Sequence, residues 1–317
     1  AVGGRGPRPA GVVGVTTPTR TAPPYKLVLR ADAPREVWLA KRKEGIGSSD
    51  VPQALGVSEW GSAQHVYYGK RGELPERDEV SEAAFWGLRH EETVARVWAE
   101  RNRAVVRRIG LIARTDPGWG HHMCTLDRLA MECPLQRDQR EKCFVEVKCR
   151  NAFVAKKWKR DVPDDVLAQV LWAIHVGGFE HGHVACLIGG NDYRQYTVRR
   201  KDHVDLIGNI VTVVDKLWRD IHLGHVPPLD GTEPVEAMLD LYSTLNPDRA
   251  GTRNLDEFPA LGVQAMDSLY GYEMGRLAEK AGKAEKDHAK VALVEALGGA
   301  REAVLNGDVA YELREYP

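Results

Sequence analysis

Segments with two different hydrophobic periods alternate along this chain. Apolar and polar residues follow a strand-like pattern in residues 104–108, 110–114, 123–131, 143–149, 183–188 and 193–199. Apolar residues recur at helical spacing in residues 34–43, 82–102, 164–176 and 201–222. Strands interspersed with helices are typical of an α/β fold. We therefore expect a mixed central sheet flanked by helices, followed by a C-terminal helical extension.

Composition divides the chain into three parts. Residues 1–25 are rich in Gly, Pro, Arg and Thr and lack periodic hydrophobic positions, which predicts a flexible segment. Residues 26–228 contain the strand and helix patterns and are expected to form the main domain. The Pro227-Pro228 pair marks its end. Residues 229–317 are predicted to be mainly helical, with two helices in 261–297 and a closing strand in 309–315.

Overall composition excludes several classes of protein. Hydrophobic residues make up 43% of the chain and charged residues 28%, as in ordinary globular proteins. Apolar runs are only a few residues long, whereas a membrane span needs about 20, so no membrane partner is expected. Forty-four basic residues face 45 acidic ones, which excludes a wholly basic nucleic-acid coat protein. The start of the chain shows no secretory signal, so a cytoplasmic protein is expected.

The cysteines and histidines show no familiar metal-binding spacing. Four of the five cysteines fall in one stretch, 9, 10 and 6 residues apart and without a CxxC pair: Cys124, Cys133, Cys143 and Cys149. These spacings do not match the runs that hold iron–sulfur clusters in RecB-type nucleases. We interpret the cysteines as reduced thiols. The pair His121-His122 lies near Asp127 and could supply a ligand, but a structural or surface role is expected for it. His175, His181 and His183 form no HExxH motif.

A glycine-rich turn precedes good helix-capping residues near the start of the main domain. The turn Gly45-Ile46-Gly47 leads into Ser48-Ser49-Asp50, and a short helix is expected from there towards Leu55. Free backbone N–H groups at such a turn suit an anion such as phosphate. The alternative is a turn with no ligand.

One acidic residue lies within a predicted apolar stripe. Leu88, Glu91, Ala95 and Trp98 are spaced by 3, 4 and 3 residues, so they share one face of the helix over 82–102. A buried carboxylate is costly unless it is paired or binds a metal. Glu91 is therefore either the partner of a nearby Lys or Arg or part of a metal site.

The strongest chemical signal is Glu146-Val147-Lys148 on a predicted strand. Period-two alternation places Glu146 and Lys148 on one face. Taken alone, they form a plain ion pair on an edge strand. Asp127 lies on the preceding strand-like segment, and pairing of the two segments brings both carboxylates together. Two carboxylates and a backbone carbonyl make an oxygen-rich site suited to Mg²⁺ or Mn²⁺.

This Asp…Glu-x-Lys arrangement resembles that of the PD-(D/E)xK nuclease superfamily. The wider order of motifs resembles the YqaJ-type viral recombinase family, which includes the lambda-type phage exonucleases, from about residue 37 to 189. The motifs occur in the order Trp38-Leu39-Ala40-Lys41-Arg42, Gly45 to Asp50, Gly87-Leu88-Arg89-His90-Glu91, Asp127, Glu146-Val147-Lys148 and Ala168-Gln169-Val170.

The resemblance implies roles for particular residues. Asp127, Glu146 and the Val147 carbonyl correspond to metal ligands, supported by Glu91. Lys148 corresponds to the catalytic lysine, and Gln169 to a glutamine near the reacting DNA end. Arg42 and Ser49, with Ser48 beside them, correspond to residues that bind the terminal 5′-phosphate. The sequence departs from the family where Arg128-Leu129 follows the acidic residue, and in a polar insertion over 132–142.

The resemblance also implies an activity and partners. The implied protein is a Mg²⁺-dependent exodeoxyribonuclease, with Mn²⁺ as a substitute, that resects linear duplex DNA from the 5′ end. It would leave 3′ single strands for phage-type recombination, act as a homo-oligomeric ring, and cooperate with a single-strand annealing protein in a bacterial host. Two alternatives stay open: a RecB-like or structure-specific endonuclease, and a DNA-binding recombination scaffold that does not cleave.

A basic segment follows the catalytic strand and supports a DNA partner. Residues 137–160 hold nine Lys or Arg against three acids. Lys156, Lys157 and Lys159 surround Trp158, a pattern suited to phosphate contacts with base stacking. The alternative is a solvated loop with one packed tryptophan.

Overall fold

The structure is a computed structural model that describes residues 23–75, 81–135, 142–248, 251–306 and 308–312. Most of the predicted flexible segment 1–25 and the centre of the insertion 132–142 lie outside the described residues. The chain separates into two units, one ending at Asp248 and the other beginning at Arg249. Among the described helices, none combines the length and apolarity needed to cross a membrane.

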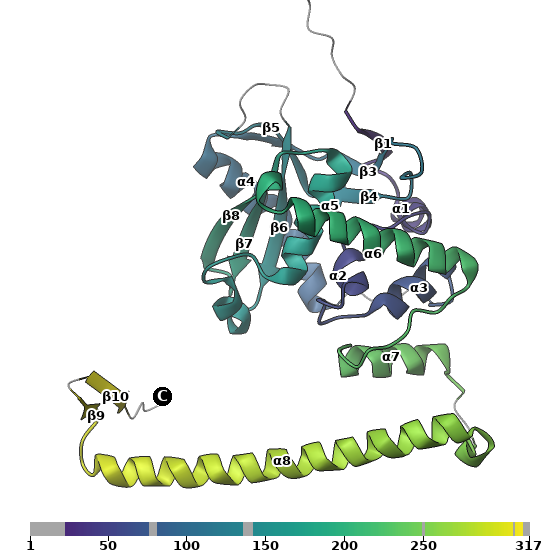
Figure 1. Cartoon of the computed structure of the whole chain (residues 1–317). Helices are drawn as coiled ribbons and strands as arrows, with labels where there is room; N and C mark the ends of the chain where they lie inside the picture. The colour runs from purple at the N-terminus through teal and green to yellow at the C-terminus, as the bar shows by residue number, and fades with distance from the viewer. Residues whose placement is uncertain (1–22, 76–80, 136–141, 249–250, 307, 313–317) are drawn as a thin grey trace, which may run out of the picture. The chain divides into compact units, whose positions relative to one another are not determined.

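A five-stranded mixed sheet forms the centre of the first unit (Figure 1). The order across the sheet is β2 (Val105–Arg107), β5 (Arg128–Glu132), β6 (Cys143–Arg150), β7 (His181–Ile188) and β8 (Asp192–Arg199). The pairs β2·β5, β5·β6 and β7·β8 are antiparallel, whereas β6 and β7 are parallel. The predicted mixed sheet is confirmed.

A second, three-stranded sheet lies beside it. It consists of β1 (Tyr25–Arg30), β3 (Gly110–Arg114) and β4 (Met123–Leu126) in the order β1-β3-β4. The stretch 123–131, predicted as one strand, is therefore two strands in different sheets, separated by Asp127. This break matters because it places Asp127 where the chain passes from one sheet to the other.

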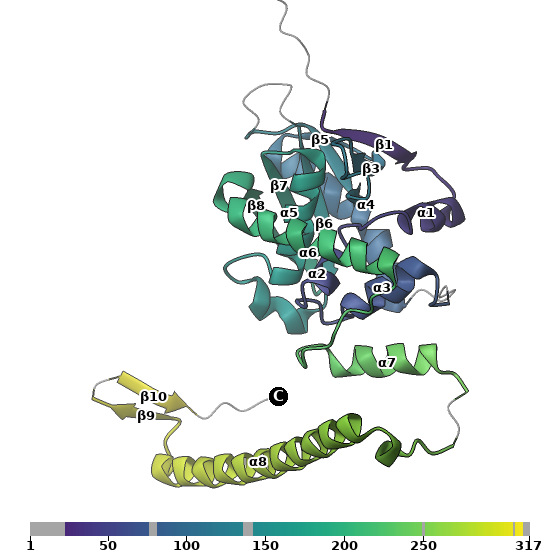
Figure 2. The same ribbon diagram turned by 45° about the vertical axis from the view of Figure 1, so that its right-hand side comes forward.

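Helices cover both faces of the large sheet (Figure 2). On one face, α4 (Glu82–Asn102) packs Val94, Ala95 and Trp98 against a cluster that includes Val145 and Val147 of β6. On the other, α5 (Asp164–Gly177) packs with β7 and β4 in the main core. The bounds of α4 are those predicted. Leu88 is exposed, however, so the predicted apolar stripe covers only the C-terminal half of α4.

Further helices surround this core. The amphipathic helix α6 buries Ile207, Ile210 and Val214 in the main cluster. The helix α7 contacts α3 through a hydrogen bond from Tyr242 Oη to Gln64 Oε1 of 3.3 Å, so the first helix after residue 229 belongs to the first unit. These helices are α1 (Arg35–Arg42), α2 (Val51–Ala54), α3 (Ala63–Arg71), α6 (Val204–Leu223) and α7 (Val235–Leu245), with 3₁₀ turns at Ala152–Trp158 and Arg200–Asp202.

The second unit contains one long helix, α8 (Pro259–Leu297), preceded by a 3₁₀ turn at Leu255–Glu257. The prediction of two helices here is wrong, because residues 261–297 contain glycines but no proline that would interrupt the helix. A hairpin of β9 (Glu302–Leu305) and β10 (Asp308–Glu312) follows, and it confirms a strand near the expected position.

Candidate active site

Asp127 lies between β4 and β5, and its side chain reaches the neighbouring strand β6. Its Oδ2 accepts a hydrogen bond of 2.7 Å from the backbone N–H of Val147. Burial, together with the nearby Glu146 carboxylate, raises the pKa of Asp127 to about 8. Two carboxylates this close repel each other unless a proton or a cation is shared between them.

Glu146 and Lys148 lie on one face of β6, as the period-two pattern predicts. Lys148 Nζ donates to Glu146 Oε1 at 2.6 Å and to Gln169 Oε1 on α5 at 2.7 Å. The predicted residues Asp127, Glu146, Lys148 and Gln169 are therefore brought together. β6 is the central strand of the sheet, paired on both sides, so the alternative of an ion pair on an edge strand is wrong.

Arg128, which the sequence showed only as a departure from the family pattern, contributes directly to this site. Its guanidinium is 4% exposed and lies between α4 and β5. Nη1 donates to Glu91 Oε1 at 2.6 Å and to the Asp127 carbonyl at 2.5 Å, while Nη2 donates to Glu92 Oε2 at 2.7 Å. Glu91 is thus the partner of a buried arginine, which was one of the two alternatives that the sequence left open. It also lies close enough to Asp127 to raise the pKa of the Asp127 carboxyl.

The donor set fits a hard divalent cation. Asp127 engages one of its oxygens with Val147 N–H, and Glu146 engages Oε1 with Lys148, so each carboxylate has a second oxygen. Carboxylate and carbonyl oxygens are the ligands that Mg²⁺ and Mn²⁺ prefer. A third carboxylate, Glu91, stands nearby. The residues present match the chemistry expected of the site.

The turn after α1 forms a compact cluster of charges. Arg42 Nη2 donates to Ser49 Oγ at 2.6 Å and lies 3.1 Å from Asp50 Oδ1. Arg42 also stacks on Trp38, with its guanidinium carbon 4.7 Å from the ring centroid. Lys70 of α3 lies 2.6 Å from Asp50 Oδ2. The predicted pair Arg42 and Ser49 is brought together. Asp50 was expected only as a capping residue, and Lys70 was missed.

Asp50 organises this turn. It is buried, which opposes its charge, but Lys70, Arg42 and the Gly47 N–H outweigh burial and hold the pKa of Asp50 below its ordinary value. The expected short helix towards Leu55 is confirmed, because α2 spans Val51–Ala54 with Asp50 at its N-cap and Leu55 at its C-cap. The expectation that Ser48 binds phosphate is wrong. The Ser48 hydroxyl is buried beside the Cys124 thiol, so Ser48 does not present it to a ligand.

Backbone bonds fix the turn to the start of β4. Ile46 N donates to the His121 carbonyl at 2.8 Å, and Met123 N donates to the Ile46 carbonyl at 3.0 Å. Only glycine fits at position 45, because a Cβ there would lie 2.4 Å from the His121 carbonyl oxygen. Trp38 Nε1 donates to Thr125 Oγ1 at 3.3 Å, two residues before Asp127. The turn is therefore bonded to the start of β4, and Asp127 directly follows the other end of this short strand.

Sequence comparison shows a match for the same residues. Residues 37–180 match the model of the YqaJ-like viral recombinase domain. The uncharacterized protein YqaJ of Bacillus subtilis (strain 168) is 31% identical over 217 residues, which cover 67% of this chain and 65% of the length of that relative. The chain belongs to the YqaJ-type viral recombinase family.

In this YqaJ-type chain, Asp127 directly precedes β5, and the adjacent strand β6 carries Glu146-Val147-Lys148. Among solved structures, the alkaline exonuclease LHK-Exo from Laribacter hongkongensis matches with a TM-score of 0.48 and 16% identity, over 60% of this chain and 94% of that chain. Its complex with dAMP matches with a TM-score of 0.49, at the same identity and coverage.

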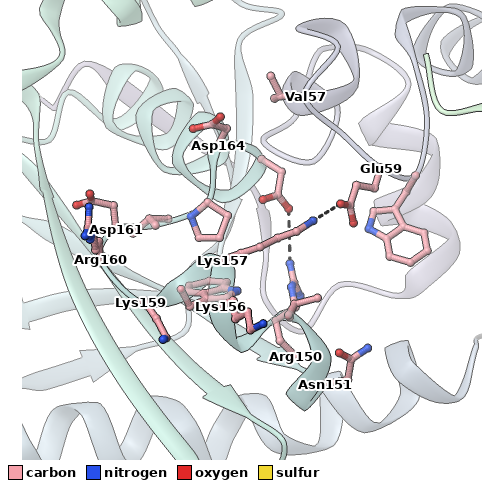
Figure 3. Close-up of a pocket in the computed structure, with 16 residues that line it drawn as sticks. Val57, Glu59, Arg150, Asn151, Lys156, Lys157, Lys159, Arg160, Asp161 and Asp164 are labelled. Carbon is pink, nitrogen blue, oxygen red and sulfur yellow. Dashed lines mark hydrogen bonds and ion pairs between the residues drawn. The ribbon is translucent and has the colours of Figure 1, made fainter. Parts of the chain in front are cut away.

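The basic segment lines an open pocket of about 700 Å³ beside α5 (Figure 3). Lys157 forms an ion pair with Glu59, and Arg150 Nη2 lies 3.9 Å from Asp165 Oδ2. Lys156 and Lys159 are exposed. Trp158 is only 1% exposed, so the expectation that it stacks on bases is wrong and the alternative of a packed tryptophan holds. The exposed aromatic ring of this segment is Phe153, at 94%.

A histidine network lies behind β4 in this YqaJ-type core. Asp215 Oδ1 of α6 lies 2.9 Å from His121 Nε2 and 2.8 Å from His122 Nε2, and His122 Nδ1 lies 3.0 Å from His175 Nε2. Burial lowers the pKa of His122 to about 4 and that of His175 to about 3, so both rings are neutral near pH 7. The network connects α5 and α6 to the residues that precede β4, in agreement with the structural role expected for His121 and His122.

Proposed function

We propose that this protein is a divalent-metal-dependent deoxyribonuclease that resects linear duplex DNA from the 5′ end and leaves a 3′ single strand. The observation that carries the proposal is the convergence of Asp127, Glu146 and Lys148 from adjacent strands, with Gln169 of α5 holding the lysine. This is the residue set needed to hydrolyse a phosphodiester. The names of the matching family, a YqaJ-like viral recombinase domain, and of the matching structure, an alkaline exonuclease, agree with a nuclease function.

The oxygens of Asp127, Glu146 and Val147 would hold Mg²⁺, or Mn²⁺ in its place, with Glu91 as a supporting carboxylate. A bound ion of this kind lowers the pKa of a bound water and stabilises charge that develops on the phosphate. The Val147 N–H orients Asp127 through one oxygen and leaves the other for the cation.

Lys148 is the proposed catalytic lysine. Its Nζ has three protons, of which Glu146 and Gln169 accept two, so the third is available to orient the attacking water. Gln169 acts as a positioning residue, because its carbonyl oxygen holds the ammonium over the face of β6. Burial of the lysine strengthens these charge-assisted bonds.

Arg42 and Ser49 are proposed to bind the terminal 5′-phosphate. Both side chains lie at one turn, and backbone bonds hold that turn to the start of β4, the strand that Asp127 follows. Asp50 and Trp38 fix the arginine in place, so its remaining N–H groups are preorganised for an anion. A phosphate site joined to the carboxylates through β4 favours an enzyme that starts at a DNA end.

The first test is a paired digestion. Linear duplex with 5′-phosphates and covalently closed circular duplex are each incubated with Mg²⁺ and, separately, with EDTA. Loss of the linear DNA alone, and only with Mg²⁺, is expected. Cleavage of the circle would indicate the RecB-like or structure-specific endonuclease, and binding without cleavage would indicate the scaffold. A homo-oligomeric ring and an annealing-protein partner stay predictions, to be checked by sedimentation and by co-purification.

We expect Arg42→Ala to weaken the preference for phosphorylated ends. Loss of a charge-assisted phosphate contact worth about 1.5–3 kcal/mol should raise KM for 5′-phosphorylated duplex roughly ten- to a hundredfold, with a smaller change for 5′-hydroxyl duplex. Initial rates on the two substrates measure this effect. Arg35→Ala, an exposed residue of the same helix, serves as the control. An equal loss on both substrates would contradict the assigned role.

We expect Lys156 and Lys159 to contact the DNA backbone. Each phosphate contact contributes about 0.9 to the slope of log K against log salt concentration, so replacing both lysines with alanine should reduce that slope by about 2. Binding of fluorescent duplex across a salt series measures the slope. The matched control replaces Lys216 and Arg219 on the exposed face of α6. Equal slopes for both double variants would place the DNA elsewhere.

A further inference from the structure

Four potential metal ligands meet at one end of the large sheet, where Cys143 begins β6. Within the described residues, the ligand atoms of Cys133, Cys143, His181 and His183 all lie within 4.8 Å of one another. Two thiols and two imidazoles are the donor set of Cys₂His₂ zinc sites.

Three adjacent strands bring these residues together. Cys133 directly follows β5, and Cys143 is the first residue of β6, its antiparallel neighbour. β7 runs parallel to β6, and its register sets His183 opposite Val145. His181 and His183 are two residues apart, so both point to the same face of β7 as the thiol of Cys143. The parallel crossover through α5 therefore completes a set that is scattered in the sequence.

The distances suit tetrahedral coordination. Bonds of about 2.3 Å to sulfur and 2.0–2.1 Å to nitrogen place neighbouring ligand atoms of a tetrahedral zinc ion roughly 3.3–3.8 Å apart. Cys133 Sγ lies 3.5 Å from His181 Nε2 and 3.2 Å from His183 Nε2. One ion fits between atoms at this spacing, whereas the two irons of a cluster would hold the thiols and the imidazoles farther apart.

The surroundings orient the ligands as a metal site requires. His183 Nδ1 lies 3.0 Å from Thr197 Oγ1 on β8, which leaves Nε2 to face the cluster. The Leu135 N–H donates to Cys133 Sγ at 3.4 Å, a contact that favours a thiolate. Trp98 of α4 packs on the His183 ring, with the centroids 4.8 Å apart. Cys143, His181 and His183 are buried and Cys133 is half-buried, so the ligands are held within the fold.

We propose that Cys133, Cys143, His181 and His183 bind one structural Zn²⁺ ion. The ion would link the start of β7 to the residues at both ends of the 134–142 connection. β5 follows Asp127 directly, and β6 carries Glu146 and Lys148, so the ion would hold the two strands that support the carboxylate site. Glu146 is three residues beyond Cys143, roughly 10 Å along the strand, and the two metal sites are separate.

Metal analysis of the purified full-length chain tests this proposal. We expect about one zinc per chain after preparation under reducing conditions and gel filtration in dilute EDTA. Cys133→Ser, at the most accessible of the four ligands, should lose the zinc and lower the unfolding temperature by roughly 10 °C. The matched control is Cys149→Ser, a half-buried cysteine of β6 outside the cluster, which should keep the zinc. Glu146→Gln should also keep it, which makes the result independent of nuclease activity.

Measurements on the unaltered protein test the proposal even if a variant does not fold. Organomercurial titration should release zinc to a colorimetric chelator in step with modification of two thiols. Replacement of zinc by Co²⁺ should give the visible d–d bands of a tetrahedral site and a thiolate-to-cobalt charge-transfer band. Absence of metal, iron in place of zinc, or a disulfide between Cys133 and Cys143 in the reduced preparation would each overturn the proposal.

Discussion

Lys148→Met is expected to reduce cleavage of linear duplex about a hundred- to a thousandfold while DNA binding is retained. The methionine keeps the apolar stem but removes the ammonium that contacts Glu146 Oε1 and Gln169 Oε1. Loss of one preorganised charged donor at a reacting centre has an effect of this size. Single-turnover digestion measures the chemical step, and fluorescence anisotropy with Ca²⁺ in place of Mg²⁺ measures binding.

Two further variants separate catalysis by Lys148 from positioning. Gln169→Leu keeps the lysine but removes the acceptor that holds it, so a smaller loss of about tenfold is expected, with rescue by Gln169→Glu. Lys216→Met removes an exposed lysine of α6 that is paired with Asp220, and it should cleave normally. Full activity of Lys148→Met would remove the proposed mechanism.

Local patterns predicted the elements that carry the chemistry. The face shared by Glu146 and Lys148 follows from strand alternation alone, so it was confirmed. The ends of α4 and α5 are set by residues next to them in the sequence: Ser81 accepts a hydrogen bond from Ala84 N, and Gly178 ends α5 at a φ of +63°. Such signals act within a few residues and need no knowledge of the fold.

Non-local contacts could not be predicted in the same way. Residues 104–108 and 110–114 were both expected as strands, but β2 pairs with β5, whereas β3 pairs with β1 and β4. The partner of Glu91 lies 37 residues away on a strand of the other layer, and no spacing rule connects it to Arg128. The same holds for the cluster of cysteines and histidines, because the parallel pairing of β6 and β7 joins segments about 40 residues apart.

Burial decided the cases in which one sequence pattern allowed two structures. Basic residues around Trp158 suit a solvated base-stacking surface as well as a packed ring, and only the contact of Trp158 with Tyr196 on β8 separates the two. Ser48 and Ser49 are equivalent as a capping pair, but one hydroxyl is buried beside Cys124 and the other bonds to Arg42. The neighbouring residues in the sequence do not predict which of these side chains is buried.

Arg128→Met is expected to destabilise the first unit by about 3 kcal/mol and to make its stability depend more strongly on Mg²⁺. The buried guanidinium neutralises Glu91 and donates to the Asp127 carbonyl, so its loss leaves a partly buried carboxylate unpaired beside two others. In EDTA the unfolding midpoint should fall by roughly 10 °C. Bound Mg²⁺ supplies the missing positive charge, and ligand binding stabilises the folded state by mass action.

Thermal unfolding of the variant and of the natural protein, each with EDTA and with Mg²⁺, measures both effects. The matched control is Arg96→Met on α4, where the arginine is exposed and pairs with an exposed Glu100, so a change below about 0.5 kcal/mol is expected. A midpoint for Arg128→Met equal to that of the control would show that Glu91 needs no cationic partner. If Mg²⁺ raised the unfolding midpoint equally in the variant and in the natural protein, Arg128 would not be coupled to the metal site. The guanidinium and the metal would then stabilise independent parts of the fold.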